Sequence, residues 1–572
     1  MRQYWKYIKP NLPYFIFGPL LMLTEVGGEI VLPKIMSMMI NIGVETGDGA
    51  YIISRALMMI GSICVMIIGG IGGHFLSIRA AIYFSALLRK DLFKSVQKFS
   101  FRNIDEFSTG SLVTRLTNDV TQIEQTIRMC LIMLMRSPGL LVGGIIMALS
   151  INSALAKILL IVIPFLAAAI FFLMKKAFPR FGVMQKKIDN LNSATQENIT
   201  NVRVVKSFVR EKFEIKKFNK ANEDLTNATL NAMRVIIFNM PVMTLAMNIT
   251  TLAIVWRGGN FVVGGTMGVG DLSAFTTYIV QILMSLMMLS MIIIQGSRAA
   301  ASSARIKEVL NAEVDLTDDN ARCPKKTVEN GEIEFKNVSF KYYTDREGYI
   351  LKNISFRVMP SQTVGIVGTT GSGKSTLVQL IPRLYDTLDG EVLVDGINVK
   401  DYSIKNLRDG VGMVLQKNVL FSGSIKDNLK WGNENATDEE IEEFAAYAQA
   451  DKFIDNFTDG YEMELGQGGV NVSGGQKQRL CIARALLKRP KILILDDSTS
   501  AVDTATEAKI QEAFKTTLKD TTKLIIAQRI SSVIGADKIL VLENGEIVGE
   551  GTHEELLLNC EAYKEIYYSQ NN

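Results

Sequence analysis

Six long apolar stretches in the first 305 residues constrain the fold of this chain more than any other feature. They lie near residues 14–41, 56–78, 129–150, 158–174, 235–256 and 272–297. The last two contain no Asp, Glu, Lys or Arg, and each exceeds the roughly 20 helical residues that cross a hydrocarbon core. No stretch of this length follows residue 330. We therefore predict an α-helical membrane domain of six spans over residues 1–305, in agreement with the mean hydropathy of +0.19.

Basic residues predict which side of the membrane each connection faces. The loops at residues 43–51, 151–154 and 258–270 contain no Lys or Arg, whereas the segments after the second and fourth stretches are rich in both. Since Lys and Arg favour the cytoplasmic side, we expect a multi-pass protein of the cell membrane with a cytoplasmic N-terminus and a cytoplasmic C-terminal part. The N-terminal MRQYWKYIKP has no small-residue cleavage site, so we expect an interfacial helix leading into a retained span.

The cytoplasmic connections are unusually long. No proline lies between Pro33 and Pro138, so one helix can run from about residue 52 to 97. Such a helix measures roughly 70 Å, about twice the thickness of the bilayer core. The stretch 175–234 extends from the membrane in the same way. We predict that these rods couple the membrane mechanically to a cytosolic domain.

Two kinds of side chain in the membrane domain are candidates for a substrate path. Glu25 and Glu29 lie four residues apart, hence on one helix face, and an intramembrane carboxylate suits a cationic substrate. Pairing with Lys34 or with another helix is the alternative. Methionine stripes suit varied apolar ligands, and helix or lipid contact is an equal alternative. The stripes are Met240, Met243 and Met247, and Met284, Met287, Met288 and Met291.

The pattern changes after a polar and irregular segment at residues 306–330, which we interpret as a linker. Short β-branched strands then alternate with helices. This alternation predicts an α/β nucleotide-binding domain over residues 331–572, with a mainly parallel core sheet. The predicted strands are residues 333–340, 363–368, 392–396, 491–496, 523–528 and 538–548.

The sharpest local motif is a strand, TVGIVG, that runs into GxxxxGKS. Glycines let backbone N–H groups curve around phosphate, and the start of the following helix adds partial positive charge. The motif predicts an ATP site in which Lys374 reaches the β- and γ-phosphates and Ser375 ligates Mg²⁺. The ATP-binding residues are Gly368, Thr369, Thr370, Gly371, Ser372, Gly373, Lys374, Ser375 and Thr376.

A second motif is the apolar strand KILILD, which ends in Asp496. P-loop enzymes place the acid that holds Mg²⁺ at the end of such a strand. Many strands end in Asp, so the motif is specific only together with the P-loop. The pair predicts an α/β fold of the P-loop NTPase type.

Between these motifs lies Ser473-Gly474-Gly475-Gln476, and here the chain resembles the ATP-binding cassette (ABC) family, whose signature is SGGQ at a helix N-terminus. The resemblance covers nearly the whole chain and implies a half-transporter of the multidrug or lipid exporter type. It implies that Tyr342 stacks on adenine, that the Gln416 loop links Mg²⁺ to the membrane helices, and that residues 500–503 cross a dimer interface. Two stretches resemble the coupling segments of the family, residues 106–120 and 197–211.

Two positions depart from the pattern of the family. Catalytic members carry Glu after the Mg²⁺ aspartate, where it acts as the general base. Here the residue is Asp497, whose side chain is one methylene shorter. A base placed roughly 1 Å farther from the attacking water can lower the rate of hydrolysis on the order of 10²-fold. The family histidine that holds the γ-phosphate and this base is replaced by Gln528, which donates a hydrogen bond but carries no charge. His74 lies in a predicted span and His553 near the C-terminus, so neither substitutes for it. We predict a site that binds ATP and barely hydrolyses it.

The resemblance also implies a partner. In this family two cassettes enclose two ATP molecules, each between one chain's P-loop and the other chain's SGGQ. The intact signature here suits a heterodimer whose second half-transporter hydrolyses ATP, and a slow homodimer is the alternative. We expect an ATP-driven exporter of amphiphilic or drug-like small molecules. A regulatory subunit that moves nothing and a lipid flippase are the rivals.

Charge and cysteine content exclude other classes. The formal net charge is only +4 and the basic residues are spread along the chain, which gives a nucleic-acid partner no electrostatic support. The five cysteines form no CxxC pair. We interpret them as unpaired thiols without a metal site.

Overall fold

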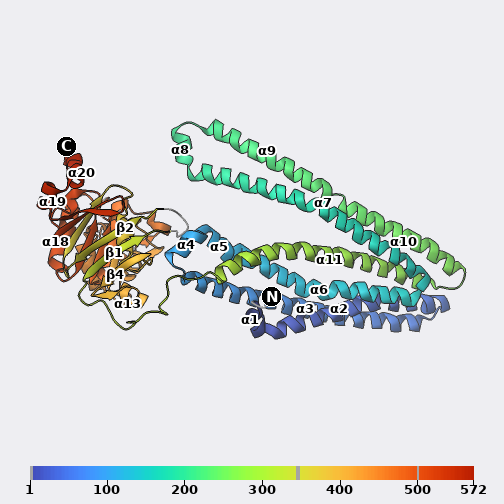
Figure 1. Cartoon of the computed structure of the whole chain (residues 1–572). Helices are drawn as coiled ribbons and strands as arrows, with labels where there is room; N and C mark the ends of the chain where they lie inside the picture. Colours follow the sequence, from blue (N-terminus) through green and yellow to red (C-terminus); the bar gives the residue numbers. More distant parts are fainter. Residues whose placement is uncertain (1–3, 343–347, 499–500, 572) are drawn as a thin grey trace. The chain divides into compact units, whose positions relative to one another are not determined.

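The computed structural model describes residues 4–342, 348–498 and 501–571. The chain divides into two compact units, each described here by itself. The first unit comprises Met1–Gln97 and Gly110–Asn311, and the second comprises Lys98–Thr109 and Ala312–Asn572. The first unit is helical, and the second carries β-sheets covered by helices (Figure 1).

Six helical segments among the described residues are long and apolar enough to cross a membrane, and each overlaps one of the predicted stretches. The prediction of six spans is therefore confirmed. The helices of this unit are α1 (Trp5–Ile8), α2 (Leu12–Met38) with the π-helical η3 (Met39–Val44), α3 (Gly49–Gln97), α5 (Thr109–Thr114) with the π-helical η4 (Arg115–Asp119), α6 (Val120–Ile151), α7 (Ser153–Thr200), α8 (Val202–Ser207), α9 (Glu211–Ile236), α10 (Asn239–Val263) and α11 (Val269–Leu310).

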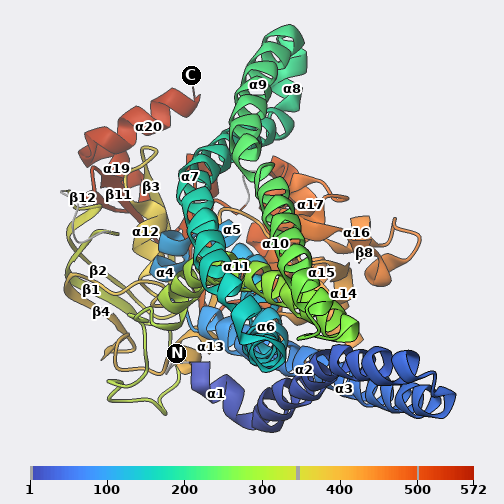
Figure 2. The same cartoon turned by 90° about the vertical axis from the view of Figure 1, so that its right-hand side faces the viewer.

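Helix α2 packs against α3, α6 and α11, and α6 packs against α11. Glycines permit the close approach of α2 to α3: a Cβ at Gly73 would lie 3.0 Å from the carbonyl oxygen of Gly18, and one at Gly69 would overlap Thr24 Oγ1. The start of α7 packs against α6 and α11, and toward α8 the helices α7 and α9 run side by side and diverge from the other helices of this unit (Figures 1 and 2). The 49-residue α3 spans roughly 73 Å, so the predicted rods are present.

Helix α11 continues to Leu310, although the sequence analysis began an irregular linker at residue 306. The apolar face of the helix explains the difference, because Ile306 and Val309 are 0% and 1% exposed. A polar contact holds the preceding turn: Arg305 Nε donates to Asp119 Oδ2 at 2.8 Å. The chain is irregular from Asn311 to the first strand.

The second unit is built around a six-stranded sheet with the order β12-β11-β3-β10-β9-β6. The neighbours from β11 to β6 are parallel, and β12 is antiparallel to β11. The predicted, mainly parallel core sheet is confirmed. Its strands are β3 (Thr363–Gly368), β6 (Val411–Val414), β9 (Ile492–Asp496), β10 (Thr522–Ile526), β11 (Lys538–Glu543) and β12 (Glu546–Gly551).

A separate antiparallel sheet has the order β2-β1-β4-β5. It contains two of the predicted strands, which therefore do not join the core sheet. Its strands are β1 (Ile333–Phe340), β2 (Leu351–Val358), β4 (Asp389–Val394) and β5 (Ile397–Asn398), and a two-stranded ribbon pairs β7 (Gly423–Ser424) with β8 (Glu464–Leu465). Strands β2, β5, β6, β7 and β8 are not among the predicted strands, since β2 buries mainly one face and the others have only two to four residues.

Ten α-helices among the described residues belong to this second unit. They are α4 (Phe101–Phe107), α12 (Lys374–Gln379), α13 (Ile404–Asp409), α14 (Ile425–Lys430), α15 (Asp438–Tyr447), α16 (Asp451–Ile454), α17 (Gly474–Leu487), α18 (Thr504–Thr517), α19 (His553–Asn559) and α20 (Glu561–Asn571). Apolar side chains on both faces of the six-stranded sheet form two large buried clusters. The sheet is thus a rigid support for the loops at its carboxyl edge.

Candidate functional site

The strand register brings the three predicted motifs together. Ile526 of β10 pairs with Ile366 of β3 on one side and with Asp496 of β9 on the other. Because the three strands are parallel, their following loops leave the sheet at one edge. These loops carry the P-loop, Asp497 and Gln528.

A cavity of about 550 Å³ lies at this edge. Most of the side chains that line it are site residues predicted from the sequence, and those of Ile350, Ile526, Ile566 and Gln570 are not. The lining residues are Tyr342, Ile350, Gly368, Thr369, Thr370, Gly371, Gly373, Lys374, Ser375, Thr376, Gln416, Asp496, Asp497, Ile526, Gln528, Ile566 and Gln570. Ser372 is buried, and its Oγ lies 3.4 Å from Lys374 Nζ.

The P-loop depends on glycine at its first position. Gly368 has φ +152°, and a Cβ there would overlap the carbonyl oxygen of Leu542. Lys374 Nζ donates to the carbonyl oxygens of Gly368 at 2.9 Å and Thr369 at 2.7 Å. Burial lowers the pKa of Lys374, against the opposing effect of the carboxylates at 496 and 497. The ammonium group is therefore held over the loop.

Oxygen donors that suit Mg²⁺ meet beside the loop. Ser375 Oγ donates to Asp496 Oδ1 at 2.9 Å, and Asp496 is only 2% exposed. Burial raises the pKa of Asp496, Asp497 adds to the rise, and Ser375 and Lys374 oppose it. Among the described residues, no group of three or more His, Cys, Asp or Glu side chains could hold a metal. This sparse set of ligands fits Mg²⁺, which is commonly held by one or two protein ligands together with substrate phosphates and water.

The two positions that depart from the family pattern contact each other. Gln528 Nε2 donates to Asp497 Oδ2 at 2.7 Å. Asp497 has φ +51°, an uncommon backbone conformation for Asp, and its N–H donates to the carbonyl oxygen of Ile526 at 3.0 Å. A neutral amide therefore faces a short carboxylate at the mouth of the cavity.

An aromatic cluster connects the cavity to α4. The ring of Tyr342 packs edge-on against Tyr385 with centroids 5.1 Å apart, and its OH lies 2.9 Å from Thr376 Oγ1. Tyr385 contacts α4 by its ring, at 6.0 Å from Phe101, and by its OH, which donates to Asp105 Oδ2 at 3.1 Å. This contact precedes the predicted coupling segment, which starts at residue 106.

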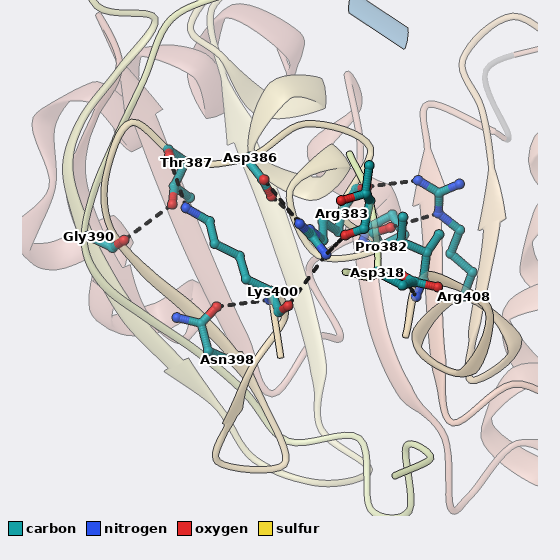
Figure 3. Close-up of polar contacts among 11 residues, drawn as sticks. Asp318, Pro382, Arg383, Asp386, Thr387, Gly390, Asn398, Lys400 and Arg408 are labelled. Atoms are coloured by element: carbon teal, nitrogen blue, oxygen red, sulfur yellow. Dashed lines mark hydrogen bonds and ion pairs between the residues drawn. The ribbon is translucent and has the colours of Figure 1, made fainter. Parts of the chain in front are cut away.

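Two arginines hold the loop that carries Tyr385 (Figure 3). Arg383 donates to both carboxylate oxygens of Asp386, from Nε at 2.8 Å and Nη2 at 3.2 Å. Arg408 donates from Nε to the Pro382 carbonyl at 3.1 Å and from Nη2 to the Arg383 carbonyl at 2.8 Å. Bidentate, charge-assisted contacts of this kind fix the geometry of a loop. Tyr385 is therefore presented to α4 from a rigid support.

The signature lies apart from this cavity, since none of the described lining residues comes from it. Ser473 caps α17 through a capping box: Ser473 Oγ accepts from the Gln476 N–H at 3.3 Å and Gln476 Oε1 from the Ser473 N–H at 2.8 Å. A Cβ at Gly475 would lie 2.7 Å from the carbonyl oxygen of Ala501, so the next loop approaches closely. Ser500 lies outside the described residues.

The tip of the α7–α9 hairpin is apolar and exposed. It comprises α8, within the predicted coupling segment at residues 197–211. Val204 is 55% exposed, Phe208 73% and Val209 79%. Such a tip is typical of a surface that another domain covers.

A charged cluster joins three helices of the first unit. Arg136 of α6 contacts Glu25 Oε1 at 3.1 Å and Glu29 Oε1 at 2.5 Å on α2, and Gln281 Nε2 of α11 donates to the Glu29 carbonyl at 3.0 Å. Glu25 and Glu29 therefore pair with another helix, which is one of the predicted alternatives. Lys34 pairs with Asp271 instead, since its Nζ lies 3.6 Å from Asp271 Oδ1. Within the part of the chain that the structure describes, Glu25 Oε2 and Gln281 Oε1 are buried without a hydrogen-bond partner.

In each methionine stripe some side chains are packed in the interior and one is exposed. Met243, Met247 and Met287 belong to one buried cluster with side chains of α7, whereas Met240 and Met284 are 62% and 49% exposed. The alternative of helix contact therefore holds for part of each stripe. Met288 is partly buried, and the Met291 side chain lies outside the described residues.

Comparison with known proteins gives matches over both units. The chain matches the family model for the ABC transporter transmembrane region over residues 15–286 and the model for ABC transporter over residues 351–500. It is 41% identical over 571 residues to the uncharacterized ABC transporter ATP-binding protein YfiB of Bacillus subtilis, covering 100% of this chain and 98% of that protein. It is 39% identical over 570 residues to the uncharacterized ABC transporter ATP-binding protein Rv1273c of Mycobacterium tuberculosis, covering 99% and 97%.

A solved structure, that of a bacterial Atm1-family ABC exporter with ATP bound, is also similar. The TM-score is 0.81 at 25% sequence identity, with 99% of each chain covered.

Proposed function

The chain belongs to the ABC transporter family, and from this premise we propose that it is one subunit of a heterodimeric exporter whose own ATP site binds nucleotide and barely hydrolyses it. The chain is an ATP-driven, multi-pass membrane transporter with a cytoplasmic nucleotide-binding cassette. The heterodimer, the impaired site and the class of substrate are our proposal.

The contact between Gln528 and Asp497 carries the proposal. A water molecule that attacks the γ-phosphate must give its proton to a base within hydrogen-bond reach. Asp497 is shorter than Glu by one methylene, and its Oδ2 already accepts the Gln528 amide at 2.7 Å. Gln528 cannot supply the positive charge of a protonated histidine. Both hydrolytic positions are impaired, while the P-loop and Asp496 keep the groups that bind nucleotide.

The same cavity has residues that would hold Mg²⁺. Ser375 and Asp496 are its ligands in our proposal, and Gln416 from the loop after β6 reaches the same cavity. The ion supplies charge neutralisation between the phosphates when bound. The chain's own residues bind and orient the nucleotide: Lys374 provides the ammonium group, and Tyr342 provides the ring that would stack on adenine.

Two separate surfaces support a partner chain. The signature at the start of α17 is intact but does not line this chain's cavity, so it is available to a partner's P-loop. The exposed apolar tip at α8 suits a cassette of the second chain. ATP would close the two cassettes, and the coupling segments would transmit the closure to the helices. Hydrolysis, mainly at the partner's site, would reopen them.

The charged cluster on α2, α6 and α11 supports a cationic amphiphile as substrate. The carboxylates of Glu25 and Glu29 share the single guanidinium group of Arg136, so the cluster has one excess formal negative charge. It lies roughly 20 Å from the outer ends of the helices, measured along the helix axes. An unbalanced charge at this depth is costly and favours a counter-ion. The free acceptor oxygens of Glu25 and Gln281 would receive N–H donors of such a ligand.

Glu25→Gln is expected to remove the preference for a cation. Dodecylammonium and dodecanol share a chain length and differ in charge, and binding of each is measured as the difference between loaded and empty nanodiscs of zwitterionic lipid. We expect the unmodified chain to prefer dodecylammonium, and Glu25→Gln to weaken its binding at least about tenfold with little change for dodecanol. Glu45→Gln, which removes an exposed charge directly after the same span, is the control and should behave as the unmodified chain. Equal binding of the two probes by the unmodified chain would contradict a cationic substrate.

A further inference from the structure

The end of the C-terminal helix α20 contacts the loop that carries Gln528. Gln570 Nε2 donates to the backbone carbonyl of Gln528 at 2.7 Å. Gln570 Oε1 accepts from the backbone N–H of Ile530 at 2.9 Å. The Gln570 carboxamide thus holds the loop on both sides of Arg529.

A carboxamide is suited to this pairing. It is neutral, and it presents one donor and one acceptor in a plane, as a peptide group does. Gln570 therefore pairs with the 528–530 backbone much as a neighbouring strand would pair with it. An acidic side chain at this position would keep the acceptor for the Ile530 N–H but would place a second oxygen against the Gln528 carbonyl.

Helix α20 is itself anchored to the cassette. Tyr563 is 0% exposed, and its OH lies 2.7 Å from His553 Nδ1 of α19. The ring of Tyr567 packs on His553 with centroids 5.4 Å apart. One turn before Gln570, Ile566 lines the nucleotide cavity. The carboxamide is therefore presented from a fixed element.

The contacts form a chain that leads into the site. Gln570 holds the backbone of residue 528, the Gln528 side chain donates to Asp497, and both of these side chains line the cavity beside the P-loop. By the resemblance to the family, the Gln528 side chain would contact the γ-phosphate, which ATP has and ADP lacks. A shift of this backbone would therefore change the affinity for ATP more than the affinity for ADP. The groups that we propose for adenine and the β-phosphate, Tyr342 and Lys374, belong to other segments that line the cavity, so we expect a shift of the 528–530 loop to affect them less.

We propose that Gln570 is a positioning residue of the nucleotide site, which fixes the 528–530 loop so that Gln528 faces the γ-phosphate. The inference rests on the proposed function of the cavity as an ATP site. If it holds, the C-terminal helix α20 is a part of the nucleotide site, and its last turn affects the ratio of ATP affinity to ADP affinity.

The test compares the dissociation constants of ATP and ADP for the full chain in nanodiscs with Mg²⁺. Loss of one exposed and one partly buried hydrogen bond changes affinity modestly, so we expect Gln570→Ala to weaken ATP binding about three- to tenfold and ADP binding less than about twofold. Gln570→Glu should behave like Gln570→Ala. The neighbouring Ser569→Ala, whose Oγ contacts only the Ile566 carbonyl among the hydrogen bonds described, is the control and should leave both constants unchanged.

A second comparison distinguishes positioning from a general role in stability. If Gln570 acts through Gln528, then Gln570→Ala should have no further effect on the ATP-to-ADP ratio in a Gln528→Ala chain. An equal loss of ATP and ADP affinity, or an unchanged ratio in Gln570→Ala, would overturn this inference alone. An unmodified chain that binds neither nucleotide would overturn the proposed function, and the inference with it.

Discussion

The double variant Asp497→Glu, Gln528→His is expected to raise ATP turnover of the purified chain by on the order of 10²-fold. Glu restores the missing methylene, and with it the reach of the base toward the attacking water. His restores a side chain that can carry positive charge beside the γ-phosphate and the base. The chain's signature is intact, so two copies of the variant can complete each other's site. Steady-state phosphate release in nanodiscs measures the effect.

The single variants are the controls for this gain. We expect Asp497→Glu alone to hydrolyse slowly, because Gln528 remains beside the new carboxylate, and Gln528→His alone to remain slow, because the base is still short. ATP binding, measured in the same samples, should stay within about threefold of the unmodified chain. Turnover at an ordinary exporter rate by Asp497→Glu alone would show that Gln528 is not an impairment.

Lys374→Ala is expected to weaken ATP binding at least about 30-fold and to abolish transport. The ammonium group of Lys374 is partly buried against the P-loop, and removal of such a charged contact typically costs about 2–5 kcal/mol. ATP-dependent uptake of ethidium, a permanently cationic dye, into inverted vesicles that contain this chain and its partner measures transport. In the proposed heterodimer, two cassettes close around two nucleotides, so we expect closure to require this site even though it hydrolyses little.

Lys491→Ala provides the matched control, because Lys491 is exposed and lies in the same cassette. It should leave ATP binding and uptake unchanged. Loss of ATP binding in Lys374→Ala without loss of uptake would contradict the transport role and favour a regulatory subunit that moves nothing itself.

The fold was largely predictable because its elements have strong local patterns. Spans such as α10 are mainly apolar over more than 20 residues, the strand β9 is a buried apolar run that ends in Asp496, and the P-loop is a motif with a fixed strand–loop–helix context. The end of α11 was less predictable. Its end mixes charged and apolar residues and leads into a polar segment, and it is helical because Ile306 and Val309 are buried by tertiary packing. The partition of six strands between two sheets was also not predictable, since it depends on long-range pairing.

Within the site, the sequence indicated which residues line the cavity but not how they contact one another. The bond between Gln528 and Asp497 joins two loops that are adjacent only in the folded sheet. Neither Tyr385 nor Gln570 carries a sequence signal of its own. Tyr385 acquires its place from the loop held by Arg383, and Gln570 from the packing of α20. The partner of Glu25 and Glu29 is not predictable from the sequence for the same reason, since Arg136 lies on a helix that is far away in sequence and adjacent only in the fold.

The most direct test of the central claim is the Mg-ATP hydrolysis rate of this chain purified alone in nanodiscs, with ATP binding measured in the same sample. We predict saturable ATP binding with turnover far below roughly 1 s⁻¹, and a large gain in the Asp497→Glu, Gln528→His preparation measured beside it. Turnover of roughly 1 s⁻¹ or more by the unmodified chain would mean that Asp497 suffices as the base, and it would contradict the proposal of a site that binds ATP and barely hydrolyses it.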